Sequence, residues 1–372
     1  MIPVNILNTS KTDYESPALL LGEQRPGLFD TIHPHHPRLR SLFRDLRNQD
    51  WDELEFPFDS CVQEFKTCAE HEFDALMDVI AYQWETDSVA AQSLVPITSQ
   101  FVTSNILNRL YARIGENEYL HAPTYSEILK NSFENPDDIL KDIHSRQHSF
   151  DRLEGVTHIY EEARIAGLEY GLGQRPNNQE LYEIAMKYLL TNLAMEGVQF
   201  TPSFTLAFAY GKQGRFMPVA DAIQKIAVDE YHIHVPTGQY VLDWEFGTER
   251  GITAWHRLSK WFIQLVRGIV HTEYSWNARQ FRGGREHMGL TNELLDMYVR
   301  YCATKILKSL KIPVPEDLLQ ERNPLPWTEQ WLNPNLRQGS AQEQRGGNYL
   351  LGGFVNDIGR RPLPEFYLGP RK

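Results

Sequence analysis

A short segment at residues 229–235, with the sequence DEYHIHV, combines two carboxylates and two imidazoles within seven residues. Acidic and histidine side chains this close together in a helical context suggest a metal site. Two pairings are open. Asp229 with His232 keeps a three-residue step, whereas Glu230 with His234 takes a four-residue step and shares a helical stripe with Ile226.

A second pair of this kind lies in ENEYLHAPTY, residues 116–125. At about 100° per residue, Glu118 and His121 lie one helical turn apart on one face, with Tyr125 a further turn along it. Burying these groups costs several kcal/mol unless they are paired or bind a metal. For this helix alone, a hydrogen-bonded polar cluster between helices is the alternative. The upstream residues on the same stripe are apolar: Ile106, Leu110 and Ile114.

Two further carboxylates interrupt apolar helical stripes. Glu196 precedes Phe200 and Phe204 at four-residue steps, and Asp87 follows Ile80 and Trp84. Four helices would then supply one acid each from two helices and an acid–histidine pair from each of the other two. That set is typical of a dinuclear carboxylate site in a helical bundle. Oxygen-rich ligands with two imidazoles suit iron or manganese better than a structural zinc.

The elements that must position these residues are helices. From about residue 57 onward, apolar residues recur at three- and four-residue steps. No alternation of strands and helices appears, and the glycines of LEYGLGQRP fit neither a phosphate loop nor a dinucleotide-binding fingerprint. We therefore predict an all-α bundle with the metal site in its core. The later helices are expected at residues 98–131, 150–172, 178–212, 216–246, 251–280 and 289–310.

Three regions are expected along the chain. Residues 1–45 are predicted to be an irregular N-terminal arm, in which His33-Pro34-His35-His36 forms an exposed loop because prolines disfavour regular structure. Residues 46–335 should form the bundle. Residues 336–372 are rich in glycine and polar residues and should form a flexible tail.

Composition narrows the class of protein. The formal net charge of the 372 residues is −12, which argues against a nucleic-acid-binding surface. The three cysteines have no paired spacing, as expected of free thiols in a reducing compartment. No apolar run approaches the ~20 residues of a membrane span, and the N-terminus lacks a signal pattern. We expect a soluble cytoplasmic protein with neither membrane nor nucleic-acid partners.

Taken together, these residues resemble a known family, the small, radical-generating subunit of class I ribonucleotide reductase. The likeness runs from about Phe73 to about Leu350. The segment FRGGREHMGL, followed by NELLDMYVRY, and the run RNPLPWTEQWL are similar to segments of that family. The residues that match its metal ligands in order and approximate spacing are Asp87, Glu118, His121, Glu196 and Glu230.

The resemblance implies a ferritin-like bundle and a radical enzyme. Two iron ions, with manganese as the alternative, would react with dioxygen and leave a tyrosyl radical at Tyr125. The apolar pocket that shields this radical would be Phe200, Phe204 and Ile226.

The resemblance also implies a relay and two kinds of partner. The oxidising equivalent would pass through His121, Asp229 and Trp51 to Tyr349, which lies six residues after Glu343 in the tail. A separate large subunit would receive it and reduce ribonucleoside diphosphates to deoxyribonucleotides. The chain would form a homodimer and dock on that subunit through its tail, although the end LPEFYLGPRK departs from the acidic, aromatic-ended tails of the family.

The pairing in DEYHIHV departs from the family's Glu-x-x-His spacing, because Ile233 stands three residues after Glu230. One inserted residue between acid and histidine restores the match. Pro236 supports this, since it removes a helical hydrogen bond at His232 and favours a kink or a single wide turn. We predict that Glu230 and His234 are ligands, that Asp229 is the relay acid, and that His232 faces away.

Two rival functions keep the bundle and the metal. One is a stand-alone di-iron oxidase, and the other is a ferritin-like iron-binding protein. Neither needs a shielded tyrosine at position 125 or a relay pair at Glu343 and Tyr349.

Overall fold

The computed structural model describes residues 18–22 and 27–333. Within these residues the regular structure is helical, and the only β-type pairings are two isolated bridges, Leu20 with Val102 and His287 with Leu290. The prediction of an all-α fold is therefore confirmed. None of the described helices is both long and apolar enough to cross a membrane.

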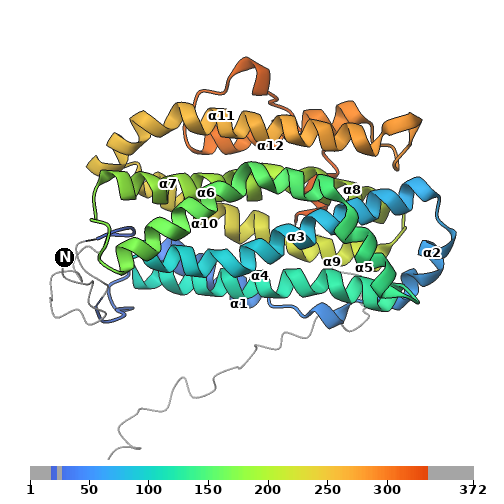
Figure 1. The fold of residues 1–372 in the computed structure, drawn as a ribbon, viewed down its shortest axis with the longest axis horizontal. Helices are drawn as coiled ribbons and strands as arrows, with labels where there is room; N and C mark the ends of the chain where they lie inside the picture. The colour runs from blue at the N-terminus through green and yellow to red at the C-terminus, as the bar shows by residue number, and fades with distance from the viewer. Residues whose placement is uncertain (1–17, 23–26, 334–372) are drawn as a thin grey trace, which may run out of the picture. The chain divides into compact units, whose positions relative to one another are not determined.

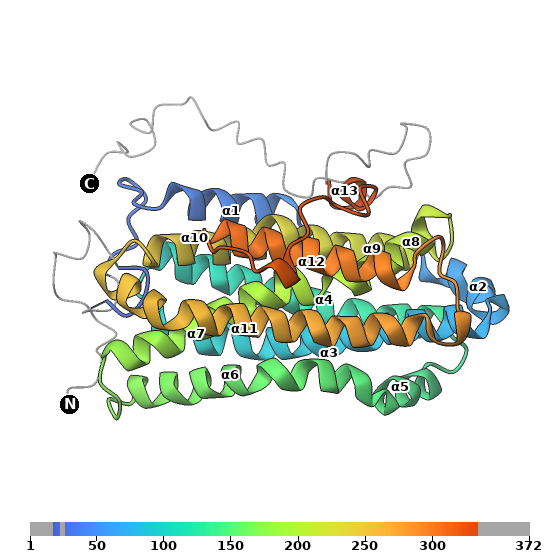
Figure 2. The ribbon, with the colours of Figure 1, turned by 90° about the horizontal axis from the view of Figure 1, so that it is seen from above.

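Four long helical segments form the centre of the bundle (Figures 1 and 2). The first two are single helices that pack along each other. The other two are each interrupted by a π-helical turn. The segments are α3 (Glu70–Phe101), α4 (Asn105–Ser132), the run of α7 (Gln179–Ala194), η4 (Met195–Gln199) and α8 (Thr201–Lys212), and the run of α9 (Met217–Asp229), η5 (Glu230–His234) and α10 (Val235–Glu245).

Further helices cover this centre. In Figure 1, α11 and α12 lie on one side of the central helices and α1 lies on the opposite side, against α4 and α10. The covering helices are α1 (Pro37–Asn48), α6 (Gln147–Gly171), α11 (Glu249–Gln280) and α12 (Asn292–Ser309). Shorter elements complete the bundle: η2 (Glu53–Glu55), η3 (Phe58–Cys61), α2 (Val62–Thr67), α5 (Pro136–Ser145), η6 (Arg282–Gly284), η7 (Glu316–Leu318) and α13 (Thr328–Trp331).

Local sequence sets where these helices start and how closely they pack. The side chains of Asn178, Thr248 and Thr291 each accept a hydrogen bond from a backbone N–H in the first turn of α7, α11 and α12. Between α3 and α4, Gly115 allows a close approach, because a Cβ there would lie 2.4 Å from Cγ2 of Val95. The two helices that carry Asp87 and Glu118 are thereby held together.

The N-terminal segment corrects one prediction. Helix α1 begins at Pro37, inside the region predicted to be irregular, and it buries Leu39, Leu42 and Leu46. Proline disfavours the interior of a helix but is well tolerated in its first turn, where no intrahelical N–H bond is lost. In this region Pro37 therefore marks the start of a helix.

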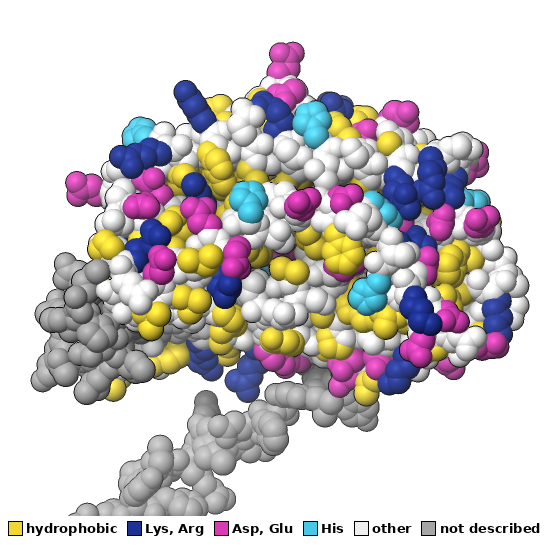
Figure 3. Space-filling model, viewed as in Figure 1, with side chains coloured by type: hydrophobic (Ala, Val, Ile, Leu, Met, Phe, Trp, Pro, Cys, Tyr) yellow, Lys and Arg dark blue, Asp and Glu magenta, His cyan; other side chains and the backbone are white. Residues whose placement is uncertain are grey.

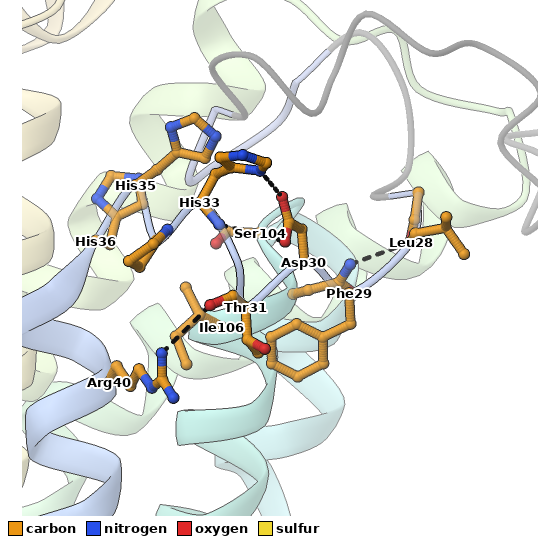
Figure 4. A pocket seen from close by; sticks show the side chains of 13 residues that line it. Leu28, Phe29, Asp30, Thr31, His33, His35, His36, Arg40, Ser104 and Ile106 are labelled. Atoms are coloured by element: carbon orange, nitrogen blue, oxygen red, sulfur yellow. Dashed lines mark hydrogen bonds and ion pairs between the residues drawn. The ribbon is translucent and has the colours of Figure 1, made fainter. Parts of the chain in front are cut away.

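The histidine-rich loop corrects a second prediction, that residues 33–36 are all exposed. His33 and His35 are exposed, as expected, but His36 is only 3% exposed. Its Nδ1 lies 3.0 Å from the Tyr240 hydroxyl, and its ring packs edge-on against Trp244. Figure 4 shows this loop beside α1 and the start of α4, where it lines a pocket of about 70 Å³ and His33 contacts Asp30.

Acidic and basic side chains are interspersed over the face shown in Figure 3. The residues predicted to bind metal are buried beneath the surface.

Candidate metal centre

The six predicted metal ligands project into the centre of the four helical segments. Each is at most 6% exposed. Atoms of four of them, Glu118, Glu196, Glu230 and His234, lie within 4.8 Å of one another and form a group that could hold a metal ion. The contributing elements are α3 for Asp87, α4 for Glu118 and His121, η4 for Glu196, and η5 for Glu230 and His234.

Two carboxylates lie between the two imidazoles. Glu118 places Oε2 3.5 Å from Nδ1 of His121 and Oε1 3.3 Å from Nδ1 of His234. Glu230 places Oε1 3.3 Å from the first ring and Oε2 2.7 Å from the second. Each carboxylate thus directs one oxygen to each histidine, which is the arrangement needed to bridge two metal positions.

The inner atoms of this site lack hydrogen-bond partners. Within the described part of the chain, no Lys or Arg forms an ion pair with any of its four carboxylates. Buried polar atoms without partners are rare, so an external cation is expected to satisfy them. The atoms that make no hydrogen bond within the described residues, although several lie at ion-pair distance from one another, are Asp87 Oδ1, Glu118 Oε2, His121 Nδ1, Glu196 Oε2, both Oε atoms of Glu230, and His234 Nδ1.

The electrostatics agree with this geometry. Burial, followed by the charges of neighbouring carboxylates, raises the pKa values of Asp87 and Glu196 well above their usual range. Burial alone would lower the pKa of His234, but the charge of Glu230 raises it to about 10. Without a metal, Asp87 and Glu196 therefore hold protons, whereas the neighbouring histidines hold the pKa of Glu230 below its usual range; a metal ion would displace the protons.

The DEYHIHV segment contains the wide turn expected from its sequence. Residues Glu230–His234 form a π-helical turn, and Pro236 follows in the first turn of α10. This turn places Glu230 and His234 on the same side, whereas His232 points outward with Nε2 2.6 Å from the backbone oxygen of Leu332. A second π-turn, Met195–Gln199, carries Glu196 and was not predicted from the sequence. Such turns often occur at functional sites.

Comparison with known proteins decides the family. Residues 29–315 match the family model described as "Ribonucleotide reductase, small chain". The chain belongs to this family.

Named relatives and solved structures agree with this assignment. The chain is 26% identical over 266 residues to a ribonucleoside-diphosphate reductase subunit beta of Buchnera aphidicola, covering 68% of this chain and 70% of the relative. It is 24% identical over 321 residues to ribonucleoside-diphosphate reductase 1 subunit beta of Escherichia coli O157:H7, covering 82% and 84%.

Solved structures show the same fold. A ribonucleotide reductase R2 subunit from Clostridium botulinum aligns with a TM-score of 0.77 at 20% identity, over 90% of this chain and 99% of the other. The dimanganese(II)-NrdF of Streptococcus sanguinis aligns with a TM-score of 0.66 at 18% identity, over 82% and 99%. The small-chain bundle is thus ferritin-like, as the sequence predicted.

In this small chain, the tyrosine at position 125 lies beside the carboxylate cluster. Tyr125 is fully buried, and its hydroxyl donates a hydrogen bond of 2.9 Å to Oδ2 of Asp87. Burial, followed by the charge of Asp87, raises the pKa of Tyr125 well above its usual range, so the phenol keeps its proton. The three residues predicted to shield it, Phe200, Phe204 and Ile226, are at most 1% exposed and belong to the same apolar cluster.

The predicted relay residues form a connected chain. Trp51 donates from Nε1 to Oδ2 of Asp229 at 2.8 Å, and the same oxygen lies 3.2 Å from Nε2 of His121. The rings of Trp51 and His121 are nearly parallel, with centroids 6.0 Å apart. The other two predicted relay residues, Glu343 and Tyr349, lie outside the described residues.

Sequence reasoning missed Asn117. This residue precedes Glu118 on α4 and contacts both Asp229 and His234. No local pattern marks it, because its two partners are 112 and 117 residues away.

Proposed function

We propose that this chain is the radical-generating small subunit of a class I ribonucleoside-diphosphate reductase. The observation that carries the proposal is a buried cluster of four carboxylates and two imidazoles whose inner atoms lack partners, next to a buried tyrosine hydrogen-bonded to one of those carboxylates. Membership of the small-chain family supports it.

The residues fit a dinuclear metal centre. Asp87 and His121 would hold one ion, Glu196 and His234 would hold the other, and Glu118 and Glu230 would bridge them. Iron suits this donor set, and manganese is the alternative, supported by the name of the dimanganese(II) neighbour. When bound, the two ions would activate dioxygen and supply the oxidising equivalent that removes an electron from Tyr125.

The protein residues control what happens at Tyr125. Losing one electron from the phenol requires that the O–H bond break, and Oδ2 of Asp87, 2.9 Å away, is placed to receive the proton. The phenoxyl radical that remains survives only where water and reductants are excluded. The buried side chains of Phe200, Phe204 and Ile226 provide this exclusion.

Transfer out of the site would follow the chain His121, Asp229 and Trp51. Asp229 is 1% exposed, so its hydrogen bonds to Trp51 and His121 are protected from competing water. The radical would then reach Tyr349, with Glu343 in the same tail, and pass to the large subunit, which binds and reduces the ribonucleotide. We also propose a homodimer that docks on the large subunit through the C-terminal tail.

The test is electron paramagnetic resonance of the full chain after loading with ferrous iron and exposure to oxygen. The wild type should show a tyrosyl radical, Tyr125→Phe should not, and Tyr119→Phe should. Tyr119 is a suitable control because it lies on α4 but is 59% exposed. Absence of a radical in fully metallated wild type would overturn the proposal and favour a stand-alone oxidase or an iron-binding protein.

A second test concerns the partner. Ribonucleoside-diphosphate reduction should require this chain together with a large subunit, and Tyr125→Phe should abolish it. Reduction by the large subunit alone, or equal reduction with the variant, would contradict the assigned role.

A further inference from the structure

Asn117 links two of the residues proposed to act at the metal centre. Its Nδ2 donates to Oδ2 of Asp229 at 3.0 Å, and its Oδ1 lies 3.0 Å from Nε2 of His234. The side chain is 3% exposed, so no bulk water competes for these bonds. One amide therefore joins the second histidine of the site to the acid that also contacts the first.

The surroundings fix which way this amide points. Oδ2 of Asp229 also accepts from Nε1 of Trp51 at 2.8 Å and faces Nε2 of His121 at 3.2 Å. The indole N–H of Trp51 can only donate, so Oδ2 of Asp229 is an acceptor, and Asn117 turns its NH₂ group toward Asp229 and its oxygen toward His234. The assignment of the amide thus follows from the hydrogen-bond network.

The amide orientation in turn selects the tautomer of His234. Because Oδ1 of Asn117 only accepts, Nε2 of His234 must carry a hydrogen when it makes this bond. Its Nδ1 is then directed to the interior, 2.7 Å from Glu230 and 3.3 Å from Glu118. His121 is arranged in the same way, with Nε2 toward Asp229 and Nδ1 toward the carboxylates.

We propose that Asn117 is a positioning residue that transmits the orientation set by Asp229 to His234. A single carboxylate then determines which nitrogen both histidines present to the metals, acting on His121 directly and on His234 through the amide. Glu230 and His234 are four residues apart across the π-turn, whereas Glu118 and His121 are three residues apart on α4. This inference rests on the proposed metal centre.

Loss of this contact should affect the two metal positions unequally. Removing a partner that orients a metal-bound histidine typically weakens metal affinity roughly 10–100-fold. In Asn117→Leu, the position at Glu196 and His234 should lose affinity by about this factor. The position at Asp87 and His121 should change less than about threefold, because His121 reaches Asp229 without the amide.

The experiment is anomalous diffraction at the manganese edge from crystals of the full chain, equilibrated with a series of Mn(II) concentrations. Occupancy at each position is measured for wild type, Asn117→Leu, the smaller variant Asn117→Ala, and Asn277→Leu. Asn277 is a matched control, because it is fully buried and donates a 2.8 Å hydrogen bond to Asp296 on α12, away from this network.

Both Asn117 variants should lose occupancy selectively at the His234 position, and Asn277→Leu should not. Equal losses at both positions, or no loss at either, would overturn the inference. A general destabilisation of the fold would lower the occupancy of the His121 and His234 positions alike. Wild-type crystals without manganese at either position would instead count against the metal centre itself.

A double-mutant cycle tests whether Asp229 acts on His234 through Asn117. Asp229→Leu removes the oxygen that accepts from Nδ2 of Asn117, so it should also weaken the His234 position. Adding Asn117→Leu to that variant should then cause less than about a threefold further loss, because both changes break one connection. Losses that multiply would show that Asp229 and Asn117 act independently and would overturn the transmission from one to the other.

Discussion

Two groups of buried carboxylates in this molecule are neutralised in different ways. The metal cluster consists of Asp87, Glu118, His121, Glu196, Glu230 and His234. The arginine cluster is centred on Asp78, which is fully buried and accepts hydrogen bonds from Arg146, from Arg279 at 3.0 Å and from Gln280 at 3.1 Å. His148 lies 3.0 Å from the same carboxylate.

The carboxylates of both clusters are buried, but among them only Asp78 has arginine partners in the described part of the chain that neutralise its charge. Burial alone would raise the pKa of Asp78, yet His148 and Arg146 lower it below its usual range. In the metal cluster, burial and neighbouring acids raise the pKa values of Asp87 and Glu196. A carboxylate matched by arginines stabilises the fold by itself. A set of carboxylates without such partners costs stability until a cation binds.

The largest expected effect is in the arginine cluster. Asp78→Asn should lower the free energy of unfolding of the metal-free protein by about 3–5 kcal/mol, because it leaves Arg146 buried with one fewer counter-charge. Urea denaturation at pH 7 measures this. A loss below about 1 kcal/mol would mean that the pairing is not what holds Asp78 in the core.

Metal addition should have the next largest effect. At a free metal concentration of about 10 times the dissociation constant, each bound ion should stabilise the fold by about 1.4 kcal/mol, which is about 2.8 kcal/mol for the two ions. The shift should appear in the wild type and in Asp78→Asn, and it should be reduced in His234→Ala. Thermal unfolding with and without Mn(II) measures it. An equal shift in His234→Ala would show that the metal that stabilises the fold binds outside this cluster.

Glu85 provides a buried carboxylate outside both clusters. Burial raises its pKa to about 7, although Arg152 acts to lower it, and neither carboxylate oxygen has a hydrogen-bond partner within the described residues. It lines a cavity of about 650 Å³ between α3, α5 and α6. Because its pKa is higher in the folded than in the unfolded chain, stability should fall as pH rises from about 4.5 to about 7.

Glu85→Gln should remove this fall. The variant should match the wild type near pH 4.5 and exceed it by about 2 kcal/mol at pH 8, a figure reduced from the full linkage value because Glu85 is only half-buried. Urea denaturation at the two pH values is the measurement. An unchanged pH dependence would show that Glu85 ionises without cost in the folded protein.

The smallest expected effect is in the metal cluster itself. Glu196→Gln should leave the metal-free protein as stable as the wild type or more stable by about 1 kcal/mol, because it removes a carboxylate that burial already disfavours. The same variant should bind metal more weakly. A marked loss of metal-free stability would indicate that Glu196 is compensated within the protein, as Asp78 is.

Local spacing predicted the metal cluster because helical periodicity reports which side chains share a face. Glu118, His121 and Tyr125 could be placed together in this way, and Pro236 indicated the wide turn that selects His234 over His232. The π-turn at Glu196 was not predicted, although Pro202 follows Glu196 by six residues just as Pro236 follows Glu230. The proline alone was not enough for the prediction, which at residues 229–235 also needed the unusual spacing of acid and histidine.

Contacts between distant segments could not be predicted in the same way. His36 was expected to be exposed because its neighbours are prolines, but it is buried by Tyr240 and Trp244. Asn117 and the buried pair of Arg152 and Glu273 depend equally on partners more than 100 residues away. Such pairings follow from how helices pack, and the spacing within one helix does not contain that information.

The most direct test of the central claim is the number of Mn(II) ions bound per chain at equilibrium. We compare the wild type with His234→Ala and with His232→Ala, which is the matched control from the same turn. We predict two ions for the wild type and for His232→Ala, and one or none for His234→Ala. Two ions bound to His234→Ala, or a loss of bound ions in His232→Ala, would contradict the assignment of the metal cluster as the dinuclear site.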